Sequence, residues 1–483
     1  MRARRLLLCL LGLVVVLGVT AGAAFALLVG TAIEVPGTGA LNTGGIAGTA
    51  SVSCASAGEC SAGGGYTDSS GHGQAFVVNE SGGVWGTAMK VPGTAGLNTG
   101  SAAFALVSSV SCASPGNCSA GGFYRGSSNH QQAFVVDASG GVWANAIEVP
   151  TTAILNAGGY AALNSVSCAS PGNCSAGGYY TDGSNREQAF VVDETNRIWG
   201  TAIKVPGTGS LNTGSNGTVG KIAGVNSVSC ASVGNCSAGG FYTGSSGKVQ
   251  AFVAKETNGV WGTAILVPGM GSLNHYIAKV DSVSCASAGN CSAGGAYIDS
   301  SGYRQAFVVT ETTGTWGTAI KVPNTGALNT DGWAEVLSVS CAGAGKCSAG
   351  GYYSTYANNA PRQHAFVVQE NNGVWGTAIQ APGTAGLNTG GFAAVNSVSC
   401  YAIGHCVAGG YYTDSSNHNQ AFALRANNGV WGTAIEVPGT AGLNTGGYAE
   451  VSSVSCVSGG QCAAGGGYST NPGHKGQAFV THP

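Results

Sequence analysis

The tetrapeptide S-V-S-C recurs eight times along the 483-residue chain, and this repetition limits the fold more than any other feature. Successive copies lie 55 to 62 residues apart, so the chain consists of units of nearly equal length. A fixed period of this size is typical of repeat architectures, in which each unit packs on its neighbours. The copies end at Cys54, Cys112, Cys168, Cys230, Cys285, Cys341, Cys400 and Cys456.

Each unit contains four short runs with strand character: A-x-V-x-S-V-S-C, C-S-A-G-G-x-Y, Q-A-F-V-V and V-W-G-T-A-I-x-V-P. β-Branched and aromatic residues fill the runs, and turn sequences such as Asn-Gly and Pro-Gly-Thr separate them. The 83 Gly residues disfavour long helices, since an interior Gly costs about 1 kcal/mol relative to Ala. These patterns predict an all-β chain in which each unit is one four-stranded blade of a β-propeller.

The two ends of the repeat array are complementary. Residues 30–36 have the sequence of a fourth run, while the last unit stops after its third run, residues 477–480. If the N-terminal segment is the outermost strand of the last blade, the ring closes and protects its sheet edges. We therefore predict a closed eight-bladed β-propeller with terminal strand closure, and a linear β-solenoid is the alternative. The expected blades are residues 44–92, 102–149, 158–205, 220–267, 275–322, 331–381, 390–437, and 446–483 together with 27–36.

The N-terminus has the pattern of an export signal. Three Arg precede an apolar run from Leu6 to Val19, and Ala24-Phe25-Ala26 matches the small-x-small cleavage pattern. We expect a signal peptide at residues 1–26 and a single propeller domain at residues 27–483, secreted into the extracellular space or held at the cell surface. An uncleaved anchor is the alternative, although no linker would then separate it from the domain. We expect no membrane span after signal removal.

Every unit carries two cysteines in the pattern C-x5-C, which bridges the turn between the first and second runs. In an exported protein this pattern predicts a disulfide. A structural zinc site needs four ligands and each unit offers two, so we expect no metal at the cysteines. The predicted pairs are Cys54 with Cys60, Cys112 with Cys118, Cys168 with Cys174, Cys230 with Cys236, Cys285 with Cys291, Cys341 with Cys347, Cys400 with Cys406 and Cys456 with Cys462.

Charge argues against nucleic acid as a partner. Without the three Arg of the signal, 15 basic side chains remain against 20 acidic ones, and no basic run occurs. A protein that binds phosphates needs a clustered basic face. We expect a monomer whose partner is a glycan, another surface polymer or a protein.

Two family resemblances are visible in the repeats. The turn before each Trp, as in Asn79-Glu80-Ser81-Gly82-Gly83-Val84-Trp85, resembles the Asp-box of sialidase-like propellers, with Glu in place of Asp. This resemblance implies a hairpin between the third and fourth strands, and Ala138 and Ala426 depart from it. Gln363-His364-Ala365-Phe366 and the Gln-Ala-Phe of the other units resemble the HAF-type extracellular repeat, for which we know of no assigned activity.

The loops after the second and fourth runs share one rim, where we place the candidate binding residues. Eight residues before each S-V-S-C Cys the chain has a large apolar side chain, which either stacks on sugar rings or packs between blades. Polar side chains precede the third run, either as hydrogen-bond donors to a ligand or as solvated loop tips. The candidates are Phe104, Tyr160, Trp333, Phe392 and Tyr448 from the first set, His72, His130 and His418 from the second, and Arg362 at the end of the longer loop 356–362.

Two further polar positions recur in the loops. A Leu-Asn pair is present in all eight units and is expected to hold turns, with a ring of amides facing a ligand as the alternative. Ca2+ binding is a candidate role for the acids of Y-x-D-x-S, although one carboxylate per loop supplies few ligands. We expect no other cofactor. These acids are Asp68, Asp182, Asp299 and Asp414.

Catalytic patterns are missing from the sequence. It contains no G-x-S-x-G, H-E-x-x-H or P-loop, and the six Arg beyond the signal are spread over five units without forming a cluster. Similar loops repeated eight times suit weak contacts with a repeating polymer, where avidity multiplies modest affinities. We expect a non-enzymatic binding protein, and we expect no catalytic residues. The alternatives are a sialidase-type glycoside hydrolase and a structural scaffold without a specific ligand.

Overall fold

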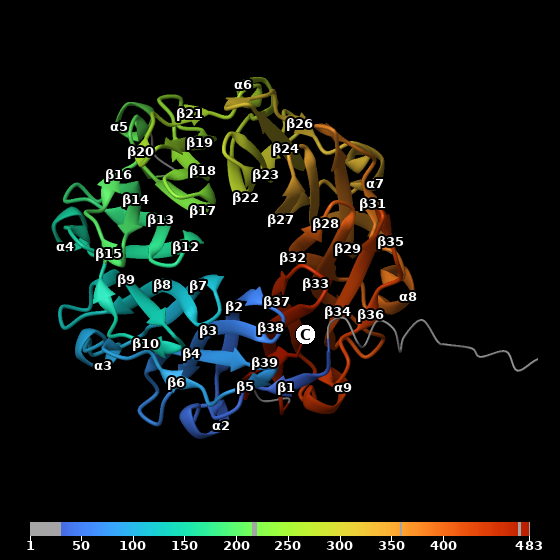
Figure 1. Cartoon of the computed structure of the whole chain (residues 1–483). Helices are drawn as coiled ribbons and strands as arrows, with labels where there is room; N and C mark the ends of the chain where they lie inside the picture. The colour runs from blue at the N-terminus through green and yellow to red at the C-terminus, as the bar shows by residue number, and fades with distance from the viewer. Residues whose placement is uncertain (1–29, 215–219, 358–359, 472–474, 483) are drawn as a thin grey trace, which may run out of the picture.

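Eight antiparallel sheets stand around a central axis and close into a ring (Figure 1). The computed structural model describes residues 30–214, 220–357, 360–471 and 475–482. The eight-bladed propeller is confirmed, and the linear solenoid alternative is wrong. The predicted signal peptide lies outside the described residues.

The S-V-S-C runs form the innermost strands, and the C-S-A-G-G runs pair with them from outside. The innermost strands are β2 (Ala47–Ser56), β7 (Leu106–Ser114), β12 (Ala161–Ser170), β17 (Ala223–Ser232), β22 (Ala278–Ser287), β27 (Ala334–Gly343), β32 (Ala393–Ala402) and β37 (Ala449–Cys456). The second strands are β3 (Glu59–Thr67), β8 (Asn117–Arg125), β13 (Asn173–Thr181), β18 (Asn235–Thr243), β23 (Asn290–Ile298), β28 (Lys346–Ala357), β33 (His405–Thr413) and β38 (Cys462–Ser469).

The third strands follow, and the outer layer consists of very short strands. The third strands are β4 (Gly73–Ser81), β9 (Gln131–Ser139), β14 (Glu187–Thr195), β19 (Val249–Thr257), β24 (Arg304–Thr312), β29 (Ala360–Asn371), β34 (Asn419–Asn427) and β39 (Gly476–Thr481). In seven blades the outer layer is a pair: β5 (Val84–Trp85) and β6 (Met89–Lys90), β10 (Val142–Trp143) and β11 (Ile147–Glu148), β15 (Ile198–Trp199) and β16 (Ile203–Lys204), β20 (Val260–Trp261) and β21 (Ile265–Leu266), β25 (Thr315–Trp316) and β26 (Ile320–Lys321), β30 (Val374–Trp375) and β31 (Ile379–Gln380), β35 (Val430–Trp431) and β36 (Ile435–Glu436).

Single helical turns lead from each outer layer to the next blade. They begin after a residue with positive φ, Gly in six cases and Thr151 or Asn324 in the other two. The turns are α2 (Thr38–Leu41), α3 (Thr94–Leu97), α4 (Thr152–Leu155), α5 (Thr208–Leu211), α6 (Met270–Leu273), α7 (Thr325–Leu328), α8 (Thr384–Leu387) and α9 (Thr440–Leu443). No helix among the described residues is long and apolar enough to cross a bilayer.

The N-terminal strand β1 (Ala32–Glu34) completes the last blade, as the ends of the chain predict. It pairs with β39 in antiparallel register, with Ile33 opposite Val480 and Glu34 opposite Phe479. In Figure 1 β1 lies at the outer edge of the sheet that contains β37, β38 and β39. The two ends of the described chain therefore hold the ring closed.

The two serines of S-V-S-C join neighbouring blades. Ser51 Oγ accepts from the amide of Val110 in the next blade at 3.0 Å, and Ser53 Oγ accepts from Cys112 at 2.9 Å. The same pair of bonds occurs at every boundary, including the closing one, where Ser453 and Ser455 bind the amides of Val52 and Cys54. Sixteen side-chain hydrogen bonds thus satisfy backbone amides on the free edge of the innermost strands.

A second ring of hydrogen bonds explains why the fourth run splits into two short strands. The register against β4 slips by one residue between Trp85 and Met89. At this point the amide of Ala88 leaves the sheet and donates to Pro36 O of the preceding blade at 2.7 Å. Equivalent bonds end with Ala32 donating to Pro438, which closes this outer ring as well.

The hydrophobic core lies between blades. Each buried cluster combines side chains from two neighbouring blades, such as Val77 of the first and Val107 of the second. The Gly-Gly of the second strand permits this approach, because a Cβ on Gly63 would stand 2.6 Å from Val107 Cγ1. Leu-Asn adds a tie at one end of the ring: Asn98 Nδ2 donates to Gly73 O at 2.9 Å, and its Oδ1 accepts from the Arg125 amide. The prediction that Leu-Asn has a structural role is therefore confirmed: the Asn side chain joins two neighbouring blades.

All eight predicted disulfides are present, and every cysteine among the described residues belongs to one. The paired residues lie directly opposite one another in the antiparallel ladder, as Cys54 and Cys60 do, with Cα atoms 3.9 Å apart. Each disulfide thus reinforces the turn end of the first hairpin of its blade. Eight disulfides are consistent with an extracellular protein.

We expect thiol titration of the denatured, unreduced mature protein to detect no free thiol, because all sixteen cysteines beyond the predicted signal are paired. Several reactive thiols, or a stoichiometric metal released by acid, would contradict the assignment.

Replacing both closing serines, Ser453→Ala with Ser455→Ala, is expected to lower the free energy of unfolding by roughly 1 to 3 kcal/mol, because two amides lose their partners. Chemical denaturation monitored by tryptophan fluorescence measures the change. Ser301→Ala, in an exposed loop, is the control and should leave stability unchanged. Equal stability of the double variant and the control would show that these bonds do not hold the ring.

Candidate functional site

The two ends of the ring carry different loops. At one end, here called the upper end, the loop after the second strand lies beside the segment before the innermost strand: Thr67 donates to Ile46 O at 2.8 Å. At the other end, the lower end, the disulfide turn meets the box turn, with Gly83 donating to Gly58 O at 3.0 Å. The box turn is the hairpin between the third and outer strands that the resemblance to the Asp-box implies.

A ring of large apolar side chains occupies the upper end. Each precedes an innermost strand by one or two residues, so each stands at the end of a strand that lines the channel. Seven of the eight side chains are 37% to 63% exposed, and Ile222 is half-buried. These eight residues, here called the rim residues, are Ile46, Phe104, Tyr160, Ile222, Ile277, Trp333, Phe392 and Tyr448.

The structure brings the two sets of sequence candidates together across blade boundaries. The His130 ring lies against Gly159, where a Cβ would stand 2.8 Å from its Cδ2, and Gly159 directly precedes Tyr160. His418 meets Gly447, beside Tyr448, in the same way. A loop tip of one blade therefore neighbours the rim residue of the next.

Arg362 and His72 precede the Gln-Ala-Phe region of the sixth and first blades. The predicted longer loop 356–362 is wrong for its described part: the hairpin strands of the sixth blade extend into it, and Arg362 lies in β29 opposite Thr355. Arg362 packs on Gly391, the residue before Phe392, and its Nη1 donates to Thr389 O at 3.4 Å. His72 precedes Gly73, and the Phe104 ring packs on Gly73 instead. Phe104 also stacks on Phe123, with ring centroids 5.6 Å apart. Phe104 thus combines inter-blade packing with an exposed edge.

An apolar cleft of about 320 Å³ lies on the first blade between Ile46 and Phe104. It is hollow because three positions are glycine there, namely Gly48, Gly65 and Gly73. The equivalent positions of the sixth blade hold Glu335, Tyr352 and Gln363. The upper end therefore differs from blade to blade, although the blades share their fold.

A charged cluster lies at the upper boundary of the fifth and sixth blades. Lys279 Nζ is 2.8 Å from Asp281 Oδ1 and 2.7 Å from Glu335 Oε1. Arg304 Nη1 donates to Glu335 Oε2 at 2.7 Å, and Tyr352 donates to the same oxygen at 2.8 Å.

The pKa values of the two carboxyls in this cluster move apart. Burial raises the pKa of Asp281, and the neighbouring Glu335 adds to the increase. Burial alone would also raise the pKa of Glu335, but the charge of Lys279 and the hydrogen bonds around it hold that pKa at about 2. Glu335 is therefore the ionised member of the pair.

Trp333 connects this cluster to the rim. Its ring lies under the Arg304 guanidinium, 5.1 Å from centroid to Cζ, and Arg304 donates its amide to Gly332 O at 2.8 Å. Trp333 is 53% exposed, so much of the ring remains open to solvent. The sequence analysis identified Trp333 but missed Lys279, Asp281, Arg304 and Glu335. The sequence offered a signal only for Lys279 and Glu335, which are charged at a position where five of the eight units have Gly, Ala or Leu.

The loop aspartates hold their own turns. Asp68 Oδ1 accepts from the amides of Ser70 and His72 at 2.9 and 3.0 Å, and Oδ2 accepts from Gln74 at 2.7 Å. Hydrogen bonds from Gln74 and the two amides lower the pKa of Asp68 against the opposing effect of burial, which is the largest single influence. Within the described ranges, no three His, Cys, Asp or Glu side chains gather as a metal site.

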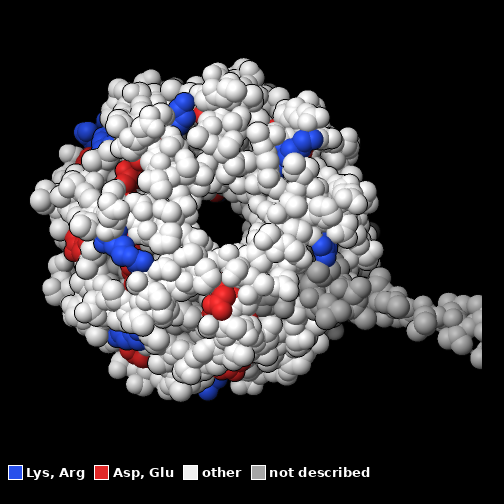
Figure 2. All heavy atoms as spheres, in the orientation of Figure 1, with Lys and Arg blue, Asp and Glu red and all other residues white. Residues whose placement is uncertain are grey.

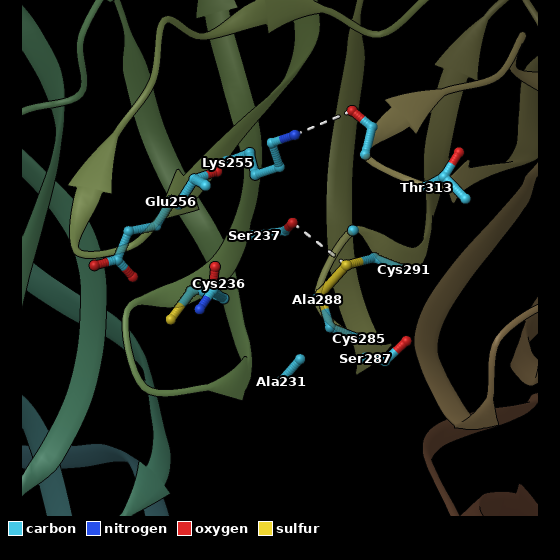
Figure 3. A pocket seen from close by; sticks show the side chains of 14 residues that line it. Ala231, Cys236, Ser237, Lys255, Glu256, Cys285, Ser287, Ala288, Cys291 and Thr313 are labelled. Atoms are coloured by element: carbon cyan, nitrogen blue, oxygen red, sulfur yellow. Dashed lines mark hydrogen bonds between the residues drawn. A yellow bond between two sulfur atoms is a disulfide. The ribbon is translucent and has the colours of Figure 1, made fainter.

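Clefts at the lower end serve the contacts between blades. Figure 3 shows one of about 200 Å³ between the fourth and fifth blades, lined by Cys236, Ser237, Lys255 and Cys291. Lys255 Nζ reaches across to Gly314 O at 3.1 Å, and Ser237 Oγ contacts Cys291 Sγ at 3.4 Å. Glu256 points away from the cleft. These polar groups join blades and are not aimed at the open space.

Two lower boundaries contain a pair of buried acids. Trp199 Nε1 donates to Asp137 at 3.0 Å, and Ser119 Oγ donates to Glu194 across the same boundary at 3.3 Å. Asp193 and Glu256 repeat this arrangement one blade further on. Burial raises the pKa of Glu194 and of Glu256 to about 7, and the acid of the preceding blade adds to the shift.

On the face that Figure 2 shows, acidic and basic side chains are scattered around a central opening and form no continuous patch of one sign.

No protein-family model matches the chain, and no curated protein matches it in sequence. Sqt1 from Chaetomium thermophilum is 9% identical over 91% of this chain and 97% of its own, with a TM-score of 0.49. The Aleuria aurantia lectin with α-methyl-L-fucoside is 12% identical over 67% and 92%, with a TM-score of 0.30. The Trypanosoma rangeli sialidase with sialic acid is 10% identical over 76% and 52%, with a TM-score of 0.36.

At these identities and scores, the likeness concerns the fold and carries no argument about activity. The propeller fold is shown. Membership of the HAF-type or Asp-box repeat families stays a prediction.

The paired acids predict that stability falls as pH rises. Because the folded-state pKa values of Glu194 and Glu256 are raised, the folded protein holds their protons more tightly than the unfolded chain. This contribution is complete below about pH 4.5 and is lost by about pH 7, a change of roughly 1 to 3 kcal/mol for each carboxyl. Glu194→Gln with Glu256→Gln should flatten the dependence in urea unfolding between pH 5 and 8. Glu436→Gln is the control, and an equally steep profile in the double variant would refute the explanation.

Proposed function

We propose that the protein is a secreted, non-enzymatic binding protein that recognises a polysaccharide or another surface polymer through the rim residues. The observation that carries the proposal is one large apolar side chain per blade, held at the upper end and left half-exposed in most blades. Soluble proteins seldom repeat exposed aromatic side chains in a ring without a partner for them. Five of the eight are aromatic, and aromatic faces stack on the apolar faces of sugar rings.

The geometry of repeated sites favours a repeating ligand. Several rim residues stand beside a side chain of the preceding blade, as Tyr160 stands beside His130 and Tyr448 beside His418, so an apolar surface and a hydrogen-bond donor recur together. A polymer that engages several blades gains avidity from contacts that are individually weak. This supports binding by the ring as a whole over one deep pocket.

A sialidase-type glycoside hydrolase is the second candidate, and the cluster of Asp281 and Glu335 is the observation in its favour. A glycosidase places two carboxyls on either side of the scissile bond, about 5 Å or more apart. Here Lys279 Nζ lies within 2.8 Å of both carboxyls, so the acids face a common ammonium group. This arrangement supports a binding role for the cluster over hydrolysis.

Removing a rim aromatic is expected to weaken polymer binding without unfolding the protein. A glycan array with the purified mature protein identifies the polymer, and titration then compares Phe392→Ala and Tyr160→Ala with the wild type. We expect about 2- to 10-fold weaker binding for each variant, the value of one aromatic contact. Ile154→Ala is the matched control, because Ile154 is 80% exposed on α4, away from the rim residues.

The proposal would be overturned if the wild-type protein bound no polymer and instead turned over a chromogenic glycoside.

A further inference from the structure

The channel wall departs from its repeat where the fifth and sixth blades meet. Six residues before the S-V-S-C Cys, five units have Gly, Ala or Leu, whereas the fifth and sixth have Lys279 and Glu335. The eighth unit has a single acid there, Glu450. A positive and a negative side chain therefore meet at one boundary of the ring only, among the residues that the structure describes.

Asp281 is a further charged residue at this boundary, at a position where three other blades make a contact between blades. At the same position three other blades have Asn, and Asn226 Nδ2 donates to Val280 O of the next blade at 2.8 Å. Asn164 and Asn396 make the equivalent bond. Asp281 makes no such bond: its Oδ1 pairs with Lys279 Nζ, and its Oδ2 is buried without a hydrogen-bond partner among the described residues. The other four blades have Ala50, Ser108, Leu337 and Ser452 at this position, so Asp281 is the one charged residue among the eight.

The two cations of the cluster retain unused donors toward solvent. Lys279 directs its ammonium at two carboxyls. Within the part of the chain that the structure describes, Arg304 reaches side-chain acceptors only through Nη1, which leaves most of its guanidinium N–H groups without one. Their side chains are 34% and 26% exposed. Glu335 pairs with both cations and Asp281 pairs with Lys279 alone, so Arg304 has a single carboxyl partner in the cluster.

We propose that Arg304, Lys279 and Trp333 form a subsite for a carboxylate-bearing sugar, a uronic acid unit of an acidic polysaccharide. The free guanidinium edge of Arg304 matches the two oxygens of a carboxylate. The exposed part of the Trp333 ring offers a face for the sugar ring beside it. The inference rests on the proposed function and specifies its ligand. The other rim residues bind the polymer, and the boundary of the fifth and sixth blades binds its acidic units.

The test compares two polymers with the same backbone. Polygalacturonate carries the carboxylate, and its highly methyl-esterified form does not. We expect the wild-type protein to bind polygalacturonate at least tenfold more tightly than the ester, the value of a charge-assisted hydrogen bond. This preference should shrink as salt is raised, since exposed charges are screened. The comparison needs no variant, so a folding defect cannot obscure it.

Variants then assign the preference to the cluster. Arg304→Gln is expected to lose about tenfold in affinity for polygalacturonate, with little change for the ester. Arg304→Lys should bind with an affinity between those of Arg304→Gln and the wild type, because lysine keeps the positive charge but lacks the paired N–H groups of the guanidinium. Arg197→Gln, at an exposed arginine in the box turn of the third blade at the lower end, is the matched control and should bind as the wild type does. Thermal unfolding of each variant confirms that it is folded.

The outcomes separate this inference from the function on which it rests. Equal binding of both polymers, with Arg304→Gln unchanged and Phe392→Ala weakened, would overturn the acidic subsite and leave the polymer-binding proposal standing. Absence of binding to every polymer would overturn both. A preference for polygalacturonate that survives Arg304→Gln in folded protein would place the selection elsewhere and refute the subsite.

Discussion

The whole ring depends on how the free edge of each innermost strand is satisfied. An unpaired strand edge in a channel would leave backbone amides without partners or open to pairing with another chain. Here the serine hydroxyls of one blade take the place of a neighbouring strand, as Ser51 and Ser53 do for the second blade. The donor sequence and the acceptor sequence are the same tetrapeptide, so each blade both offers and receives the contact. Repetition of S-V-S-C is therefore a requirement of closure.

The close approach that these bonds need determines much of the remaining composition. Serine side chains are short, so neighbouring innermost strands must lie near one another, and the second strands must leave room for the side chains of the next blade. Gly63 provides that room for Val107. The outer ends are joined separately, by the Pro36 carbonyl and the Ala88 amide. Positions within the blade are thus largely committed to structure, and variation is left to the loops and the upper ends of strands.

Features that arise within one blade, or from the phase of the repeat, could be predicted from the sequence. Cys54 and Cys60 are close in the chain and span one hairpin, and the pairing of Ile33 with Val480 follows from the complementary ends. Contacts across blade boundaries could not be predicted in the same way. Arg304 and Glu335 are 31 residues apart and belong to different blades, so their contact depends on the height at which one blade sits against the next. The sequence shows Trp333 as one of eight similar residues, and only the structure places a guanidinium over it.

Buried charge is handled differently at the two ends of the ring, and the difference bears on function. At the lower end Glu194 and Asp137 lie between packed blades, with their hydrogen bonds supplied by Ser119 and Trp199. Such groups contact other parts of the fold, so their effect is on stability. At the upper end Lys279 and Arg304 are paired yet partly exposed, which leaves donors for a partner outside the protein. Sixteen serine bonds hold the ring closed, although only three of its eight boundaries have the additional bond that Asn164, Asn226 and Asn396 donate. The redundancy of the repeat is what allows one boundary to specialise.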